Sequence, residues 1–282
     1  MTDTTALSQT ETVQSKADVV QVTALTGSIG AAISGVCLTN INDDQFVAIR
    51  TAFHEYCMLV FRDQFLSVEE HVAFTARWGE FGFNKMSPQL DDYPMVLPLS
   101  NRGKSKAVTE NWHYDSTFMT EPPAITTLSA RDIPVGGDTM WSNQYLAYET
   151  LSPGLKAMLA GVRAEFTGTR LAKLYGLDQV PRCLHPVVRT HPETGRKALY
   201  IGKPGDTVPR FEGMTPTESE PLLRFLYEHS AQPDHIYRHQ WRNGDLVMWD
   251  NRCLLHRATA NFEMDKYRRV MHRTVIKGTI PQ

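Results

Sequence analysis

Apolar residues in the first third of the chain follow two helical patterns and one continuous run. Residues 43–56 carry a helical stripe made of Phe46, Val47, Ile49, Ala52 and Phe53. The run CMLVFRDQ at 57–64 is short, apolar and followed by turn residues, so it predicts a buried strand. SVEEHVAFTARWG at 67–79 begins with a serine three residues before a glutamate and ends at a glycine, which predicts a capped helix.

From residue 92 onward, short β-rich runs alternate with clusters of Gly, Pro, Asn and Asp. Two helical patterns interrupt them, at 152–162 and 215–230. Many short strands with a few helices predict a mostly β fold, a sandwich or jelly roll with added helices. Residues 163–190 are predicted to be a long, irregular, basic connection of the kind that often covers a site.

Domain organisation and location follow from what the sequence lacks. No repeat or composition break marks a second domain, so residues 19–282 are expected to form one domain after a disordered tail, 1–18. The tail has no apolar segment of a secretory signal, and no later run of about 18 apolar residues predicts a membrane span. A cytoplasmic protein with no membrane partner is therefore expected.

Charge and cysteine content exclude two classes of function. Lys and Arg total 29 against 31 Asp and Glu, a net charge of -2, so no excess of cations is available for nucleic acid. The four cysteines have no CxxC spacing, which argues against a thiolate metal site and predicts reduced, mostly buried thiols. They are Cys37, Cys57, Cys183 and Cys253.

The segment NWHYDSTF contains the first candidate metal ligands, His113 and Asp115. Side chains two apart on a strand point to the same side, so the imidazole and the carboxylate can converge. Downstream, NGDLVMWDNRCLLHRAT places His256 after a predicted strand and turn. Two histidines and one carboxylate form the facial triad of non-haem Fe(II) oxygenases, although three such ligands also suit a zinc hydrolase. The triad by itself therefore leaves oxidation and hydrolysis open.

Two further features favour a dicarboxylate co-substrate. YRRVMHRTVI at 267–276 reads as a strand with Arg269 and Arg273 on one face, and GGDT offers the hydroxyl of Thr139 after a glycine turn. An arginine and a threonine beyond the metal form a plausible clamp for the distal carboxylate of a dicarboxylate, which a zinc hydrolase does not need. The alternative is a solvated strand face whose arginines make surface ion pairs.

From about residue 20 to 277 the chain resembles the taurine / 2,4-dichlorophenoxyacetate (TauD/TfdA-like) family of Fe(II)/2-oxoglutarate dioxygenases. The resemblance rests on WHYDSTF, EPPAITTLSARDIPVGGDT, WDNRCLLHRAT and YRRVMHR. It implies a double-stranded β-helix (jelly-roll) core flanked by α-helices, with Fe(II) held by His113, Asp115 and His256 and with 2-oxoglutarate and O2 as co-substrates. It also implies that Thr139, Arg269 and Arg273 form the 2-oxoglutarate pocket, and that Arg273, as the second arginine, faces the anionic head of the substrate. Asp115 favours hydroxylation, because related halogenases lack this carboxylate.

The same resemblance narrows the range of expected substrates. Taurine-type members have a His and a Tyr just after the GE that ends the second helix, where this chain has GEFGFNKM with Asn84 and Ser87. Taurine is thus disfavoured, and the leading hypothesis is a small apolar carboxylate such as an aryloxyalkanoate, which loses its ether group after hydroxylation. The residues expected to contact it are Phe83, Asn84, Lys85, Ser116 and Arg273, with Lys203 as a possible further contact.

Several alternatives stay open at this stage. The substrate could be a larger apolar metabolite such as a terpenoid acid, or a sulfonate or sulfate ester. A non-catalytic binding protein on the same scaffold is a separate class of function. The family resemblance also leads us to expect a homo-oligomer, either a dimer or a tetramer.

Overall fold

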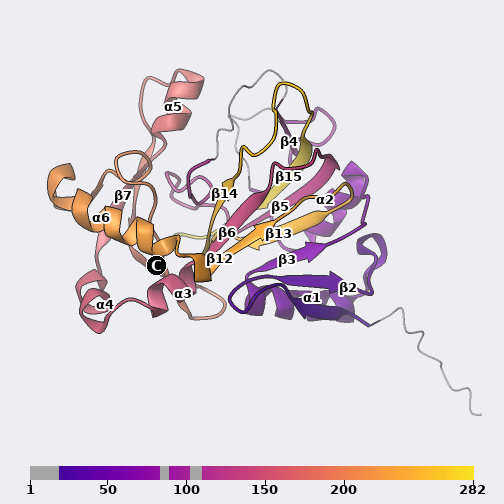
Figure 1. Cartoon of the computed structure of the whole chain (residues 1–282), viewed down its shortest axis with the longest axis horizontal. Coiled ribbons are helices and arrows are strands. Elements are labelled where there is room, and N and C mark those ends of the chain that lie inside the picture. The colour runs from indigo at the N-terminus through magenta and orange to yellow at the C-terminus, as the bar shows by residue number, and fades with distance from the viewer. Residues whose placement is uncertain (1–18, 83–88, 102–109) are drawn as a thin grey trace, which may run out of the picture.

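The structure is a computed structural model that describes residues 19–82, 89–101 and 110–282. Its largest sheet has seven strands, all paired antiparallel except β2 with β3 (Figure 1). In spatial order the strands are β1 (Gln21–Ala24), β2 (Ala31–Ser34), β3 (Met58–Phe61), β13 (Leu246–Asp250), β5 (Ile125–Asp132), β15 (Val270–Ile276) and β4 (Leu97–Ser100). The order mixes strands from both ends of the chain, so the sheet forms only when distant segments meet.

A second, three-stranded sheet packs against one face of the large sheet. Its order is β12 (Ile236–His239), β6 (Thr139–Asn143) and β14 (Leu254–Ala258). Val60 and Leu128 of the large sheet share a buried cluster with Trp141 and Leu254 of the small one. This pair of sheets, open at their edges and flanked by helices, agrees with the predicted jelly-roll core.

The other face of the large sheet is covered by α1 (Asp43–Tyr56) and α2 (Val68–Ala76). Both helices begin with a capping box, which confirms the predicted helices at 43–56 and 67–79. In β3, Met58 and Val60 face the small sheet, whereas Leu59 and Phe61 face the helices. Burial on both faces explains why this strand reads as a continuous apolar run.

The remaining helices and two small sheets form a lobe on the other side of the molecule (Figure 1). The helices are α3 (Gln144–Glu149), α4 (Pro153–Leu159), α5 (Thr169–Tyr175) and α6 (Pro216–Ser230). One sheet contains β11 (Arg210–Phe211), β7 (Arg163–Thr167) and β8 (Arg182–Pro186). The other sheet contains β10 (Lys197–Leu199) and β9 (Val188–Thr190). Ser152 and Thr215 cap α4 and α6, so the helices predicted at 152–162 and 215–230 are confirmed.

The prediction of an irregular connection at 163–190 is wrong. This segment forms β7, α5, β8 and β9, with β7 paired to both β8 and β11. In β7, Ala164 and Phe166 are buried, and the outward Glu165 pairs with Arg182 and Arg210 across the sheet. Strands of three to five residues with so many charged side chains carry too few apolar positions for the alternation to be recognised.

Two smaller expectations concern membrane-spanning helices and the burial of the cysteines. Among the described residues, no helix is both long and apolar enough to cross a membrane. Burial of the cysteines holds for Cys57 and Cys253, but Cys37 is exposed and Cys183 is half-buried. The predicted tail, 1–18, lies outside the described residues.

Candidate active site

His113, Asp115 and His256 converge between the two main sheets. Their potential ligand atoms all lie within 4.8 Å of one another, and the two imidazole rings are 4.3 Å apart between centroids. His256 lies in β14, and its backbone exchanges hydrogen bonds of 2.9 and 3.0 Å with that of His113. The expected strand around His113 is reduced to this single bridge, because Asp115 already begins a turn.

The protonation states of the three side chains suit metal binding. The Nδ1 of His113 donates to the carbonyl oxygen of Asn111 (2.8 Å), which leaves its Nε2 as the potential ligand atom. Burial lowers the pKa of His113, and burial together with the neighbouring His113 lowers the pKa of His256 to about 3; both shifts favour the neutral imidazole, the form that binds metal. Burial alone would raise the pKa of Asp115, but the nearby Arg273 and histidines outweigh it and hold that pKa well below its usual range.

A directional chain of hydrogen bonds ends on the Asp115 carboxylate. The indole N–H of Trp249 donates to Oδ1 of Asn251 (3.0 Å), and Nδ2 of Asn251 donates to Oγ1 of Thr126 (2.7 Å). The Thr126 hydroxyl therefore donates to Oδ2 of Asp115 (2.8 Å), leaving Oδ1 directed toward His256, 3.7 Å from its Nε2. Sequence reasoning missed these residues, since nothing in a Thr or an Asn identifies its partner 125 positions away.

Thr139 is buried and Arg269 is half-buried, and both are connected to the segment that leads into β6. Thr139 pairs in register with Ala258, two residues after His256 on β14, so Thr139 and His256 face the same side of the sheet. Arg269 precedes β15 instead of lying within it, and its Nε donates to the carbonyl oxygen of Gly137 (3.1 Å). Among the described residues, its terminal nitrogens have no hydrogen-bond partner.

Two neighbours orient this pair of side chains. The indole N–H of Trp241 donates to Oγ1 of Thr139 (2.9 Å), so the Thr139 hydroxyl proton points elsewhere. Gly137 has φ +67°, and a Cβ there would lie 2.9 Å from Cδ of Arg269, so only glycine lets the arginine approach. The GG pair was read as a turn, and its close packing against Arg269 becomes visible only in the structure.

The substrate contacts expected from the sequence lie in different places. Arg273 is on β15, 3.4 Å from Oδ1 of Asp115, and Ser116 follows Asp115 with a left-handed backbone (φ 48°). The amine of Lys203 donates to Asn111 (3.4 Å). Three further expected contacts lie outside the described residues: Phe83, Asn84 and Lys85.

Two cavities adjoin the turn that carries Asp115. One, of about 180 Å³, is lined by His113, Phe118 and the α5 segment that includes Arg170 and Leu171. The other, of about 700 Å³, is lined by Arg273. Ser116 and Phe118 line both cavities, so the Asp115 turn separates them.

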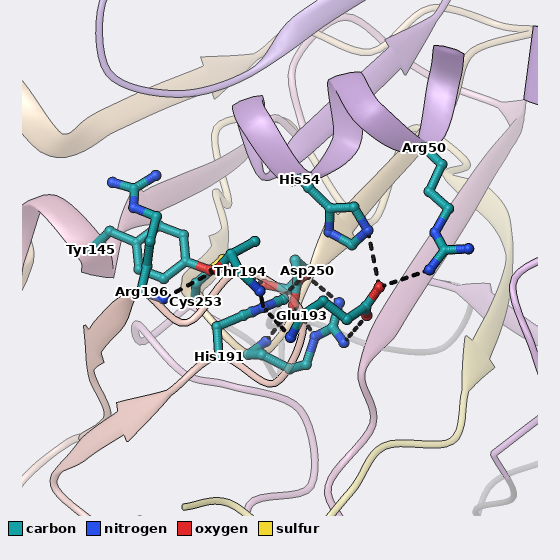
Figure 2. Close-up of polar contacts among 10 residues, drawn as sticks. Arg50, His54, Tyr145, His191, Glu193, Thr194, Arg196, Asp250 and Cys253 are labelled. Carbon is teal, nitrogen blue, oxygen red and sulfur yellow. Dashed lines mark hydrogen bonds and ion pairs between the residues drawn. The ribbon is translucent and has the colours of Figure 1, made fainter. Parts of the chain in front are cut away.

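His54, His191 and Asp250 form a second group with metal-like spacing. Figure 2 shows that the polar side-chain atoms of His191 and Asp250 already have partners within the chain. Nδ1 of His191 accepts two backbone N–H groups, and its Nε2 donates to Asp250 (3.0 Å). Arg252 forms a two-pronged pair with Asp250 and also reaches Glu193, which in turn accepts from His54 (3.0 Å). We interpret this group as an ion-pair network that anchors the β13–β14 turn.

Comparisons with known proteins place the chain among dioxygenases. The family model "Taurine catabolism dioxygenase TauD, TfdA family" matches residues 21–275. A curated relative from Sphingobium herbicidovorans, named (S)-phenoxypropionate/alpha-ketoglutarate-dioxygenase, is 36% identical over 273 residues, which cover 90% of this chain and 94% of the relative.

Solved structures give the same result. A putative alpha-ketoglutarate-dependent taurine dioxygenase from Burkholderia xenovorans superposes with a TM-score of 0.84 at 34% identity, over 93% of this chain and 94% of the other. A structure titled AAD-2 in complex with Mn(II) and N-oxalylglycine has a TM-score of 0.78 at 28% identity, over 93% and 99% of the two chains. The family model and the relatives all extend over nearly the whole chain, and the chain therefore belongs to the TauD/TfdA dioxygenase family.

Proposed function

We propose that the protein is a 2-oxoglutarate-dependent dioxygenase that hydroxylates a small, largely apolar carboxylate such as an aryloxyalkanoate. In this reaction one atom of O2 enters the substrate and the other enters succinate, while 2-oxoglutarate loses CO2. The observation that carries the proposal is the convergence of His113, Asp115 and His256 next to the Thr139–Arg269 pair. The similarity to a phenoxypropionate dioxygenase supports the substrate class.

Fe(II) fits the donor set of the triad. Two neutral imidazoles and one carboxylate, whose potential ligand atoms lie within 4.8 Å of one another, match the ligands that non-haem iron prefers and leave room for further ligands. When bound, the iron would supply the activation of O2. The chain itself would keep Asp115 ionised, hold the histidines neutral and exclude bulk water through burial.

Thr139 and Arg269 would hold the far carboxylate of 2-oxoglutarate. Arg269 presents its two terminal nitrogens as a fork, which matches a carboxylate with two parallel hydrogen bonds. Trp241 occupies a lone pair of the Thr139 oxygen, so the hydroxyl proton is available to the second carboxylate oxygen. In this arrangement Arg273, between Asp115 and the larger cavity, would lie close to both co-substrate and substrate.

A larger apolar metabolite, such as a terpenoid acid, is a second candidate. The cavity of about 700 Å³ beside Ser116 and Arg273 has room for more than an aryloxyalkanoate. Sulfonates and sulfate esters carry the same anionic chemistry and belong in the same test.

The test is a substrate panel read by succinate formation with Fe(II), O2 and 2-oxoglutarate. We expect aryloxypropionates and aryloxyacetates to give coupled succinate and phenol release. Faster turnover of terpenoid acids or alkyl sulfates would replace the aryloxyalkanoate assignment. No substrate-dependent succinate with any member of the panel would contradict the enzymatic function and favour a binding protein.

A further inference from the structure

The cavity of about 180 Å³ beside His113 is largely apolar, with one charged exception. Phe118, Leu171 and Leu174 are among its apolar lining residues, and Leu174 is 62% exposed although it belongs to a helix that lines a cavity. The exception is Arg170 on α5, the one lining side chain among the described residues with a permanent charge. An apolar space with a single cation beside the metal ligands suits a molecule that is apolar with one anionic group.

Arg170 differs from the arginines of the adjoining sheet because it lacks a protein partner. Arg182 and Arg210 on β8 and β11 both pair with Glu165, at 3.2 and 3.0 Å. For Arg170, no hydrogen bond or ion pair to any described residue is recorded. An unpaired guanidinium at the edge of an apolar cavity is available to an incoming carboxylate or sulfate.

The other cations near the centre are already engaged. Arg273 pairs with Asp115 (3.4 Å) and lines the larger cavity, on the other side of the turn. Lys277 pairs with Glu121 (3.5 Å), and Lys203 donates to Asn111 (3.4 Å). Each of these three side chains therefore already has a protein partner, which Arg170 lacks among the described residues.

The position of α5 is held by tight packing at its first turn. A Cβ on Gly168 would lie 2.9 Å from Pro181 and 3.1 Å from the ring of Phe118, so the backbone at this point is pressed against the turn that follows Asp115. This packing fixes the position of Arg170, two residues later, relative to the turn that follows Asp115. Figure 1 shows α5 at the far end of β7, away from α3, α4 and α6.

We infer that Arg170 binds the anionic group of the substrate, with the apolar body of the substrate against Phe118, Leu171 and Leu174. The ligand class is an organic monoanion, carboxylate or sulfate ester, with an apolar group of modest size. The inference rests on the proposed function for its reaction but concerns a different contact from the one expected of Arg273. It makes α5, in the segment that sequence patterns did not resolve, a determinant of specificity.

The experiment measures anion binding and turnover separately. Wild type, Arg170→Gln and a matched control, Lys173→Gln, are compared; Lys173 lies on the same helix but does not line the cavity. Each protein is loaded anaerobically with Mn(II) and 2-oxoglutarate. It is then titrated calorimetrically with phenoxypropionate, its neutral amide, and hexyl sulfate, and steady-state KM and kcat are measured with Fe(II) and O2.

We expect Arg170→Gln to weaken phenoxypropionate binding and raise KM by about tenfold or more, with much smaller effects on kcat and on the amide. Lys173→Gln should behave as wild type. An equal loss for the amide, an equal loss in Lys173→Gln, or unchanged binding in Arg170→Gln would overturn the inference. The absence of binding by either anion to wild type would also overturn it.

Binding that depends on Arg170 without any succinate formation would instead contradict the proposed function and leave the anion site standing. Tighter binding of hexyl sulfate than of phenoxypropionate would identify a sulfate ester as the source of the anion.

Discussion

Replacing Thr126 by valine should weaken metal binding while leaving the fold intact. Valine keeps the shape of the side chain but removes the hydroxyl that donates to Oδ2 of Asp115 at 2.8 Å and accepts from Asn251 at 2.7 Å. A hydrogen bond to a charged group contributes about 1.5–3 kcal/mol. If that energy holds Asp115 in its ligand geometry, metal affinity should fall by about 10- to 100-fold, the range found for partners of metal ligands.

The assay is calorimetric titration of Mn(II) into the metal-free protein, with thermal unfolding measured in parallel. Thr126→Ser, which keeps the hydroxyl, should restore most of the affinity. Thr127→Val is the matched control: Thr127 is also buried and hydrogen-bonded on β5, but its partners are His71 and Thr274, away from Asp115. Thr127→Val should therefore lower the stability of the fold and leave the affinity for Mn(II) unchanged. Wild-type affinity in Thr126→Val, or equally weak binding in Thr126→Ser, would refute the role of the hydrogen-bond chain.

Three further predictions concern the ligands, the co-substrate and pH. His113→Ala should abolish coupled turnover, and full retained activity would refute the ligand assignment. Arg269→Gln should raise the KM for 2-oxoglutarate by about tenfold or more, since the variant loses a charged two-pronged contact. Trp241→Phe should raise this KM less. An unchanged KM in both variants would contradict the assignment of this pocket to 2-oxoglutarate. His71 is buried, and burial, aided by the charges of Arg131 and His272, lowers its pKa to about 3. Because the unfolded chain then binds the extra proton, stability should fall as pH drops below about 6.5, by at most about 1.4 kcal/mol per pH unit. Urea unfolding at about pH 5 and pH 7 should show a shallower dependence in His71→Gln, and an unchanged slope would contradict the assignment.

Elements with strong local signals were predicted closely from the sequence. The helix α2 begins where the predicted cap, Ser67, lies, because a capping side chain bonds a backbone N–H only three residues away. Strand β3 was recognised because both of its faces are buried. The segment 163–190 was misread for the opposite reason: its strands are short, and Glu165 and its arginine partners obscure the alternation.

Part of the candidate site was also accessible from the sequence. The donor types of His113, Asp115 and His256, and the pairing of Thr139 with Arg269, follow from residue chemistry and from the family resemblance. Their roles as ligands stay predictions, although the structure brings the side chains together. The expected strand face shared by Arg269 and Arg273 does not form, since β15 starts at Val270 and its register shifts between Val270 and Met271.

By itself, the sequence determined the candidate metal donors, the family and the helices that local patterns mark. Only the tertiary structure decided how Asp115 is oriented, through Thr126 and Asn251, and which cation is left unpaired beside the centre, Arg170 and not Arg273. The physical reason is distance along the chain. Capping and periodicity act between near neighbours, whereas a buried hydrogen bond or ion pair depends on which remote segments the sheets bring into contact.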